Sequence, residues 1–239
     1  MISVCIATYN GEKYIKEQIN SILYQLEEND EIIVSDDGST DKTLEIIKEL
    51  NDKRIKIFYN NGLKGHTYNF ESALTHSSGD YIFFSDQDDV WLPNKVRIMS
   101  EYLKKYSAVF SDAVVVDEYL NTIKPSFFQL RNSGKGVFKN FYKNSYFGFG
   151  MAFNKDLLHF ALPFPVQKEM GHDMILGFIA NMKNSIIFID DKLTLYRRHD
   201  MSVTRLGTKQ KRRHLIEIAI GRISKLFYVS KLYLRIILR

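Results

Sequence analysis

The sequence of 239 residues contains one cysteine, Cys5, so no disulfide framework can form within a single chain. This composition is typical of a reducing compartment, and we expect a cytoplasmic protein. Cys5 lies within the apolar segment 2–7, where a small core residue explains it better than a nucleophile does. The N-terminus has no basic leader before a long apolar stretch, so no signal peptide is expected. No uncharged apolar run reaches the ~18 residues that cross a bilayer.

Two other absences narrow the choice of function. The loop after the first predicted strand lacks the Gly-x-Gly-x-x-Gly pattern, which argues against a dehydrogenase. Acidic residues are almost missing from the end of the chain, where residues 205–239 hold ten Lys and Arg against Glu217 alone. The rest of the chain carries a small excess of acids, and this argues against a nucleic-acid-binding body. The basic tail is predicted to meet an anionic surface.

The basic tail has the pattern of an amphipathic helix. From His214 to Arg239 the charged residues fall within about half of a helical wheel at ~100° per residue, and apolar residues supply a large surface. Together with the cluster at 209–213 (Lys-Gln-Lys-Arg-Arg), this composition predicts a helix over residues 209–239 that lies on anionic lipid. The alternatives are a helix that docks on the rest of the chain, or on a second copy of it in a homodimer.

Segments with strand and helix periods alternate through the first half of the chain. The predicted strands are residues 2–8, 31–35, 54–59 and 81–85, and the predicted helices are residues 13–25, 40–50, 67–75 and 94–105. This order predicts an α/β fold with a mostly parallel sheet, helices on both faces and right-handed crossovers. In the less regular second half we expect strands at residues 108–117, 185–190 and 193–198 and a helix at residues 174–182.

Polar residues cluster where three of the predicted strands end. The clusters are residues 8–11 (Thr-Tyr-Asn-Gly), 35–38 (Ser-Asp-Asp-Gly) and 85–88 (Ser-Asp-Gln-Asp). Ligands of parallel α/β sheets bind at the carboxyl ends of the strands. The three clusters are therefore expected to converge on one ligand site.

The third cluster continues into an acidic motif, Asp86-Gln87-Asp88-Asp89, directly after an apolar strand. Burying unpaired carboxylates would cost too much free energy, so we expect them at the exposed end of the strand, beside a cation or solvent. Magnesium and similar hard ions take one or two protein carboxylates together with a substrate's phosphate oxygens. An isolated Asp-x-Asp is more often an acidic turn, but its position here and the other two clusters favour a cation site.

The motifs in this order resemble the family 2 glycosyltransferases, which have the GT-A fold. The matching segments are residues 3–11, 31–41, 78–80, 86–91 and 171–173, within roughly residues 1–200. The sequence at 85–91 (Ser-Asp-Gln-Asp-Asp-Val-Trp), with Tyr-Arg-Arg-His at 196–199, is most similar to bacterial rhamnosyltransferases and related enzymes of surface polysaccharide assembly.

The resemblance implies a GT-A domain over residues 1–204, followed by a basic amphipathic helical tail at residues 205–239. Within the domain, residues 1–105 would be the nucleotide-binding half and residues 106–204 the acceptor-binding half.

The resemblance also implies that Thr8, Tyr9, Asp36 and Asp37 bind the nucleotide of a nucleoside diphosphate, with Asp86 on the nucleotide side as well. A carboxylate of the Asp36-Asp37 pair would accept the imide N–H of uracil or thymine. The alternative for this pair is capping of the helix that begins near residue 40.

Asp86, Asp88 and His199 are the implied ligands of Mg²⁺ or Mn²⁺, which would neutralise charge on a departing diphosphate. A lone histidine after a strand is, however, more often a structural hydrogen-bonding residue. Arg197 and Arg198 are implied clamps for the diphosphate, because a guanidinium binds phosphate through paired donors.

Asp173 is the implied general base. Glycosyl transfer with inversion needs a carboxylate that takes a proton from the acceptor hydroxyl as this hydroxyl attacks the anomeric carbon. Glu169 is the nearest rival, and the non-catalytic alternatives are an N-cap at Asp173 and a solvated charge at Glu169. Family members often have Trp after the corresponding acid, where this chain has Met174. Trp91 is expected to pack against the fourth strand rather than on a sugar.

Taken with the resemblance, these residues predict a metal-dependent, inverting glycosyltransferase that moves a hexose or deoxyhexose to a surface glycan or a lipid-linked acceptor. By resemblance, the first choice of donor is dTDP-rhamnose, with UDP-hexoses second. The predicted place of work is the inner face of a bacterial cell membrane.

Two alternatives stay open. A sugar-phosphate nucleotidyltransferase usually has a glycine- and Arg/Lys-rich loop after the first strand, whereas residues 9–13 of this chain are poor in glycine and cations. A non-catalytic nucleotide- or membrane-binding homologue would have no physical reason to keep Asp86, Asp88 and Asp173 as unpaired acids at one edge of a sheet.

Overall fold

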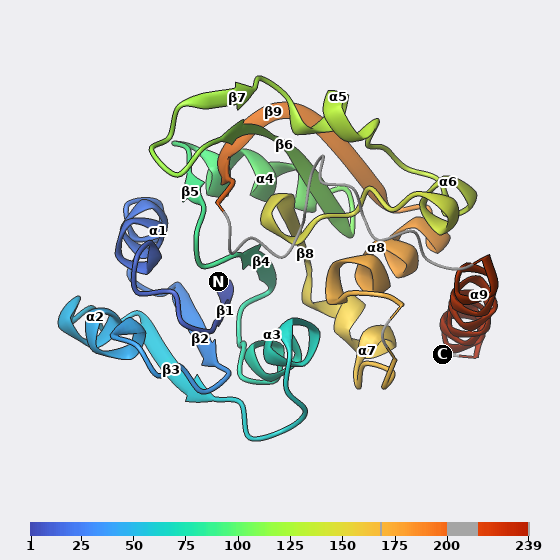
Figure 1. Cartoon of the computed structure of the whole chain (residues 1–239), viewed down its shortest axis with the longest axis horizontal. Coiled ribbons are helices and arrows are strands. Elements are labelled where there is room, and N and C mark those ends of the chain that lie inside the picture. The colour runs from blue at the N-terminus through green and yellow to red at the C-terminus, as the bar shows by residue number, and fades with distance from the viewer. Residues whose placement is uncertain (168, 200–214, 239) are drawn as a thin grey trace.

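A nine-stranded sheet organises the computed structural model, which describes residues 1–167, 169–199 and 215–238 (Figure 1). Along the sheet the strand order is β3-β2-β1-β4-β8-β6-β9-β5, and β7 pairs with β6. Helices cover both faces of this sheet, as the alternation of strand and helix patterns predicts.

The first four strands in the sequence run parallel to one another. They are β1 (Ile2–Thr8), β2 (Glu31–Asp36), β3 (Ile55–Tyr59) and β4 (Tyr81–Ser85). Their register places Thr8 beside Asp36 and Ile6 beside Ser85. The carboxyl ends of β1, β2 and β4 therefore lie at one edge of the sheet, and the parallel arrangement predicted for the first half is confirmed.

Both faces of β1, β2 and β4 are buried because these strands are largely apolar on both sides, whereas the edge strand β3 is partly exposed. Val4 and Ile6 of β1 pack in the layer that also contains α1 (Ile15–Leu23), α2 (Thr43–Glu49) and α4 (Lys95–Leu103). Cys5 and Ala7 pack in the opposite layer, with α3 (His66–Thr75) and α8 (His172–Met182). Burial raises the pKa of the Cys5 thiol above its ordinary value, so this residue belongs to the core, as expected.

Beyond β4 the sheet is mixed. β8 (Met151–Asn154) runs antiparallel to both β4 and β6 (Ala108–Val116), and β9 (Ile186–Arg197) runs parallel to β6. β5 (Val90–Trp91) is antiparallel to β9, and β7 (Thr122–Lys124) is antiparallel to β6. The connections contain α5 (Phe127–Arg131), α6 (Val137–Tyr142) and α7 (Leu158–Ala161).

The prediction of two short strands at residues 185–190 and 193–198 is wrong, because β9 is continuous. Its register against β6 shifts from Ser111 paired with Ile189 to Asp112 paired with Lys192. The polar run at residues 190–192 therefore forms an exposed bulge that bends the strand without ending it.

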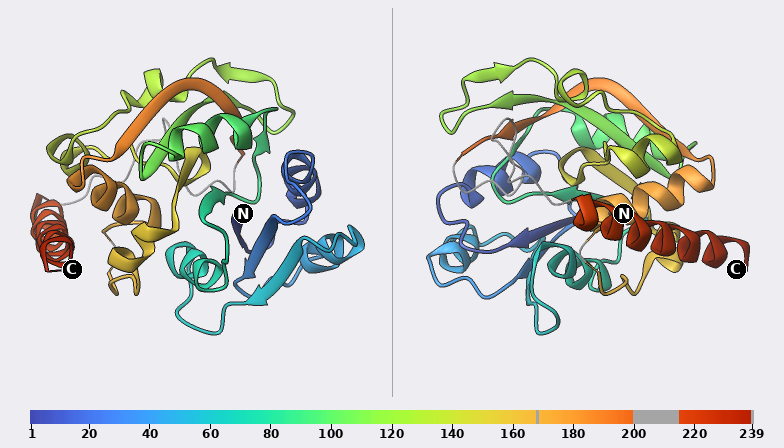
Figure 2. Two further views of the ribbon diagram at one scale, coloured as in Figure 1. Left: turned by 180° about the vertical axis from the view of Figure 1, so that it is seen from behind. Right: turned by 45° about the vertical axis from the view of Figure 1, so that its right-hand side comes forward.

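The tail forms the helix α9 (Leu215–Ile237), which lies against α7 and α8 at the edge of the molecule opposite α1 and α2 (Figures 1 and 2). The predicted helical tail is thus confirmed for these residues. The basic cluster at 209–213, His214 and the predicted domain boundary at 204 fall outside the described residues. Among the helices that can be described, none is long and apolar enough to cross a membrane.

The close packing of β1 against the start of β4 predicts a large effect of Gly79→Ala. A Cβ at Gly79 would lie 2.6 Å from the backbone nitrogen of Ser3, so the two strands would have to move apart. We expect a free energy of unfolding that is lower by about 1–3 kcal/mol, measured by urea denaturation.

Gly62→Ala is the matched control, because a Cβ there would meet its nearest atom, Oδ1 of Asn60, at an ordinary 3.4 Å. Equal unfolding midpoints for the two variants would contradict the packing described here.

Candidate active site

The three polar clusters meet at the carboxyl ends of β1, β2 and β4, as predicted from the sequence. The loops after β1 and β2 are joined by hydrogen bonds from the Thr40 backbone N–H to Oδ1 of Asn10 (2.8 Å) and from the Asn10 backbone N–H to the Ser39 hydroxyl (2.9 Å). These bonds fix the positions of the two loops relative to each other, and the acidic motif after β4 lies beside them.

Asp36 shapes the turn after β2. Its buried carboxylate accepts hydrogen bonds from the Thr8 hydroxyl (2.9 Å), the Gly38 N–H (2.9 Å), the Ser39 N–H (2.8 Å) and the Ser39 hydroxyl (2.6 Å). Gly38 has a φ of +95°, which favours glycine at this turn. Asp36 and Thr8 therefore stabilise the turn that borders the site, through hydrogen bonds inside the protein.

Asp37 points to the other side of the same turn. Its carboxylate accepts hydrogen bonds from the Asn60 side chain (2.9 Å) and the Gly65 N–H (2.8 Å), and Nζ of Lys64 lies 3.5 Å away. The alternative role predicted for Asp36 and Asp37, capping the next helix, is wrong, because α2 begins at Thr43 and its cap residue makes no side-chain hydrogen bond.

Gln87 links the acidic motif to the loop after β1. Its side-chain amide accepts a hydrogen bond from the Tyr9 N–H (2.9 Å) and donates one to the Tyr9 carbonyl (3.1 Å). A Cβ at Gly11 would lie 2.5 Å from Oε1 of Gln87, so glycine allows this close approach. Gln87 is not among the residues predicted from the sequence, although its place between two aspartates offered a signal. The ring of Tyr9 remains exposed beside the loop.

Asp86 and Asp88 each contact a histidine from a different part of the chain. Oδ1 of Asp86 lies 3.3 Å from Nε2 of His66 at the start of α3, and Oδ2 of Asp88 lies 2.8 Å from Nε2 of His199. The two carboxyl side chains are 25% and 21% exposed, so a ligand can reach them. His199 is predicted at this place from the sequence, whereas His66 is not.

The acidic side chains at the site change the pKa of His66. Desolvation opposes its charged form, but the hydrogen bond and charge of Asp86, together with the charges of Asp173 and Asp88, raise the pKa of His66 above its ordinary value. His66 therefore gains a proton more readily than an ordinary histidine, between the acidic motif and the start of α8.

The donor set fits a hard divalent cation that a substrate also holds. Within residues 1–167, 169–199 and 215–238, no three His, Cys, Asp or Glu side chains are grouped so that they could hold a metal by themselves. Magnesium-type sites need only one or two protein carboxylates when phosphate oxygens and water complete the coordination. The 2.8 Å between the Asp88 and His199 atoms is close to the roughly 3 Å that separates neighbouring ligands of a small octahedral ion.

A buried pair lies beneath the acidic motif. Oδ1 of Asp89 accepts a hydrogen bond from the Arg197 backbone N–H (2.9 Å), and burial with the charges of Asp88 and Asp86 raises the pKa of Asp89. Nζ of Lys95 donates hydrogen bonds to the Phe149 carbonyl (2.6 Å) and the Thr194 hydroxyl (2.7 Å).

Burial lowers the pKa of Lys95 to about 7, although the charges of Asp89 and Asp86 oppose this change. Nζ of Lys95 lies 4.6 Å from the centre of the Trp91 ring, and Trp91 is buried against Phe83. Trp91 thus packs against the fourth strand, as expected.

Arg197 holds the loop of the acidic motif in place. Its guanidinium donates to the backbone carbonyls of Asp88 (2.7 Å) and Glu118 (2.8 Å), pairs with the Glu17 carboxylate and lies over the ring of Tyr14. The residue is only 3% exposed. These protein groups engage three of its five N–H donors and indicate that Arg197 positions the loop. Its predicted role as a diphosphate clamp stays a prediction.

Arg198 differs from its neighbour. Its backbone N–H donates to the Val116 carbonyl (2.8 Å), while Nη1 of its side chain is buried with no hydrogen-bond partner in the part of the chain that can be described. Arg198 remains the candidate for a phosphate contact.

Asp173 stands at the start of α8, where its carboxylate accepts a hydrogen bond from the Met174 N–H (2.7 Å). Burial raises the pKa of Asp173 to about 6, and Asp86 adds to this, whereas His66 and the backbone hydrogen bonds oppose it. A carboxylate of this pKa is largely ionised at neutral pH and can still hold a proton during a reaction.

Glu169, the predicted rival of Asp173, contacts the tail helix instead. A Cβ at Gly221 of α9 would lie 2.8 Å from Oε2 of Glu169.

The ring of His172, the residue before Asp173, packs in a cluster of aromatic side chains. Its buried ring stacks on Phe70, with ring centres 4.0 Å apart, and meets the ring of Phe84 edge-on at 4.7 Å. Burial and the neighbouring His66 lower the pKa of His172 well below its ordinary value, so the ring is neutral.

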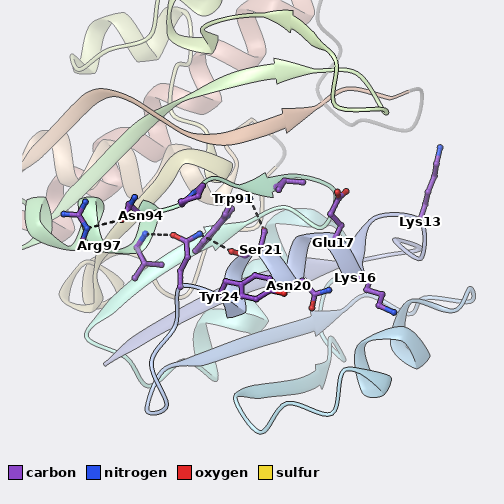
Figure 3. A pocket seen from close by; sticks show the side chains of 13 residues that line it. Lys13, Lys16, Glu17, Asn20, Ser21, Tyr24, Trp91, Asn94 and Arg97 are labelled. Atoms are coloured by element: carbon purple, nitrogen blue, oxygen red, sulfur yellow. Dashed lines mark hydrogen bonds between the residues drawn. The ribbon is translucent and has the colours of Figure 1, made fainter.

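A separate groove of about 960 Å³ lies between α1 and the segment from β5 to α4 (Figure 3). Lys13, Lys16 and Glu17 line it from the side of α1, and Asn94 and Arg97 line it from the side of α4. Neither the acidic motif nor Asp173 borders this groove.

Comparisons with known proteins relate the chain to a family and to solved folds. A family model described as glycosyl transferase family 2 matches residues 3–159. WfgD of Escherichia coli, a UDP-Glc:alpha-D-GlcNAc-diphosphoundecaprenol beta-1,3-glucosyltransferase, is 36% identical over 110 residues, which are 46% of this chain and 44% of that protein. The putative glycosyltransferase EpsE of Bacillus subtilis is 36% identical over 124 residues, 49% of this chain and 45% of that protein. The chain thus spans less than half the length of these curated relatives.

A solved structure of Staphylococcus aureus TarS 1–349 in complex with UDP-GlcNAc matches this chain with a TM-score of 0.67 and 22% identity. The match covers 84% of this chain and 59% of the TarS chain. A second match is glucosyl-3-phosphoglycerate synthase from Mycobacterium tuberculosis, solved in complex with Mn²⁺, UDP and glucosyl-3-phosphoglycerate. It has a TM-score of 0.62 and 18% identity, and the match covers 96% of this chain and 79% of that chain. These likenesses confirm the predicted fold class.

The contacts of Arg197 predict the effect of Arg197→Lys. Lysine keeps the positive charge but cannot reach three separate partners. Backbone carbonyls that accept hydrogen bonds from Arg197 would therefore lose their donor. We expect the free energy of unfolding to fall by about 1–3 kcal/mol, measured by chemical denaturation.

Arg97→Lys, at an exposed position of α4, serves as the control and should leave stability unchanged. A variant of Arg197 with normal stability but weaker nucleotide binding would instead indicate a phosphate clamp.

Proposed function

The chain belongs to glycosyl transferase family 2, and we propose that it is a metal-dependent, inverting transferase that moves a sugar from a nucleoside diphosphate to a glycan or lipid-linked acceptor. The observation that carries this proposal is the gathering of Asp86, Asp88 and Asp173, with His66 and His199, at the carboxyl ends of parallel strands. Acids alone would repel a diphosphate, so a divalent cation between the two negative groups is the arrangement that electrostatics favours.

For the donor we favour a UDP-sugar, with dTDP-rhamnose as the alternative. WfgD is named for UDP-glucose, and TarS was solved with UDP-GlcNAc. The nucleotide would lie over residues 8–11 and 36–38, with the exposed ring of Tyr9 and the carboxylate of Asp37 beside the base. Residues 1–105 would supply this donor side, and residues 106–204 the acceptor side.

Asp88 and Asp86, with His199, would hold Mg²⁺ or Mn²⁺, and Arg198 would add a donor toward the phosphates. When bound, the cation would neutralise the negative charge that forms on the departing diphosphate. Arg197 and Gln87 fix the loop that carries these ligands, so little ordering of the loop remains to be done when the donor binds.

Asp173 would act as the general base. It would accept the proton of the acceptor hydroxyl while the acceptor oxygen forms a bond to the anomeric carbon and the bond from that carbon to the diphosphate oxygen breaks with its electron pair. One base, with no second carboxylate assigned as a nucleophile, favours inversion at the anomeric carbon. The raised pKa of Asp173 supports this role.

The loop after β1 argues against a nucleotidyltransferase. The Gly11 N–H donates to the Thr43 hydroxyl (2.7 Å), and the Glu12 N–H donates to the Asp41 carboxylate (3.0 Å). These amides are therefore engaged within the protein and do not form a cradle for a triphosphate.

The reaction can be tested with a panel of UDP-, dTDP-, GDP- and CDP-sugars and Mn²⁺ or Mg²⁺, by measuring release of the nucleoside diphosphate with water as acceptor. We expect one donor to be consumed in a metal-dependent reaction. Asp173→Asn should lower the rate at least about a hundredfold, and Asp88→Asn should abolish the metal-dependent part.

Asp80→Asn is the matched control, because Asp80 is exposed at the opposite end of β4, where it pairs with the N-terminal amine. The proposed function fails if the wild-type chain binds no nucleotide sugar, with or without metal.

The pH dependence of turnover gives a second test. Asp173 must be ionised to accept a proton, so with a pKa of about 6 the rate should fall about tenfold per pH unit below that value. The charged groups that act on it are His66 from α3, which lowers its pKa, and Asp86 from the loop after β4, which raises it. The same acid limb in the residual activity of Asp173→Asn would show that another group is responsible.

A further inference from the structure

The tail helix α9 is docked on the body of the protein through one of its faces. Val229 and Leu232 are buried in the core layer of α8. The Tyr228 hydroxyl donates to the Val166 carbonyl (3.2 Å), and Nη1 of Arg235 lies 3.3 Å from the carbonyl oxygens of Phe160 and Ala161 at the end of α7. The predicted alternative of a helix docked on the rest of the chain is therefore realised for this face.

The opposite face of α9 is also apolar, and it is exposed. At ~100° per residue, its large side chains form one continuous stripe along the helix. The stripe consists of Ile220, Ile223, Leu226, Phe227, Tyr233, Leu234 and Ile237. Ile223 is 69% exposed and Phe227 is 53% exposed. An exposed apolar stripe of this length marks an interaction surface rather than ordinary solvent-facing helix.

Cations border the stripe on both sides. Arg222 lies at one edge, with its guanidinium 5.5 Å from the centre of the Tyr142 ring. Lys231 lies at the other edge, with Nζ 4.3 Å from the centre of the Phe227 ring. The sequence has no acid from residue 218 to residue 239. Long basic side chains beside an apolar stripe can reach the charged layer of a membrane while their stems stay in apolar surroundings.

The surface continues onto α6. Phe138 and Tyr142 of this helix are exposed, and Nζ of Lys225 on α9 donates to the Phe141 carbonyl (3.2 Å), which joins the two helices. The patch is therefore carried by two elements of the folded body, at the edge of the molecule seen in Figure 2.

We propose that the exposed stripe of α9, together with Phe138 and Tyr142 of α6, is a docking surface for an anionic lipid bilayer. The helix lies along the membrane plane, its apolar side chains enter the boundary between headgroups and acyl chains, and Arg222 and Lys231 contact lipid phosphates.

A second copy of the chain fits this surface less well. In a symmetric dimer the same patch meets itself, so Arg222 and Lys231 would face the same cations, and residues 218–239 supply no acid to compensate them. An anionic membrane supplies the negative charge that the stripe lacks.

Sedimentation of the full-length chain with vesicles tests the proposal. We expect binding to vesicles of phosphatidylglycerol and phosphatidylethanolamine, weakening with added salt, and little binding to phosphatidylcholine alone. The double variant Ile223→Ser with Phe227→Ser should bind the anionic vesicles at least about tenfold more weakly. Arg222→Gln with Lys231→Gln should reduce the preference for anionic lipid.

Tyr24→Ser is the matched control, because Tyr24 is an exposed aromatic residue at the far end of α1 and should leave vesicle binding unchanged. Thermal melting and donor hydrolysis should be normal in every variant, since none of these residues lies in the core or the site. The proposal is overturned if the double variant binds as well as the wild type, or if neutral and anionic vesicles bind equally. It is also overturned if the chain binds no vesicles. A dimer that the double variant dissociates in analytical ultracentrifugation would then assign the stripe to a second copy of the chain.

Discussion

Repulsion between the carboxylates at the end of β4 is the constraint on which the rest of the site depends. Asp86, Asp88 and Asp89 lie within four residues, and each contacts groups from distant parts of the chain. Two histidines contact the exposed acids, and a buried lysine lies near the third. The parallel sheet brings these partners to one edge, because the carboxyl ends of its strands coincide there. Charge that would destabilise an isolated loop is thereby partly balanced, and we propose that a divalent cation balances the rest when a diphosphate binds.

The same constraint explains why much of the local hydrogen bonding serves to hold loops. Asp36 is fully engaged in the turn after β2, Gln87 joins the acidic motif to Tyr9, and Arg197 fixes the backbone of Asp88. These hydrogen bonds hold the loops of the site in position. Asp173 lies at the start of α8, next to the neutral ring of His172 that stacks on Phe70. Burial there raises the pKa of Asp173 to about 6. In the proposed reaction, the donor and acceptor functions therefore lie on separate elements at one edge of the sheet.

The parallel half of the fold and the convergence of the polar clusters could be predicted from the sequence, because apolar runs of strand length end directly in polar motifs. The continuity of β9 could not, since a polar bulge looks like a break between strands when its partner β6 is unknown. His66 and Lys95 could not be predicted, because their partners lie 20 and 99 residues away and no local pattern records those contacts. Gln87 has a partner 78 residues away, and its place between two aspartates was the only local signal. Arg197 is predicted from the sequence as a phosphate ligand. Its burial against protein groups is a tertiary property that the sequence does not show.

Calorimetric titration of UDP into the chain, with and without Mn²⁺, is the most direct test of the central claim that the acids at the end of β4 hold a diphosphate through a cation. If they do, Mn²⁺ should strengthen UDP binding at least about tenfold, because without it the phosphates meet the carboxylates directly. Equal UDP affinity in the presence and absence of the metal would contradict that claim and leave Asp86 and Asp88 with a structural role.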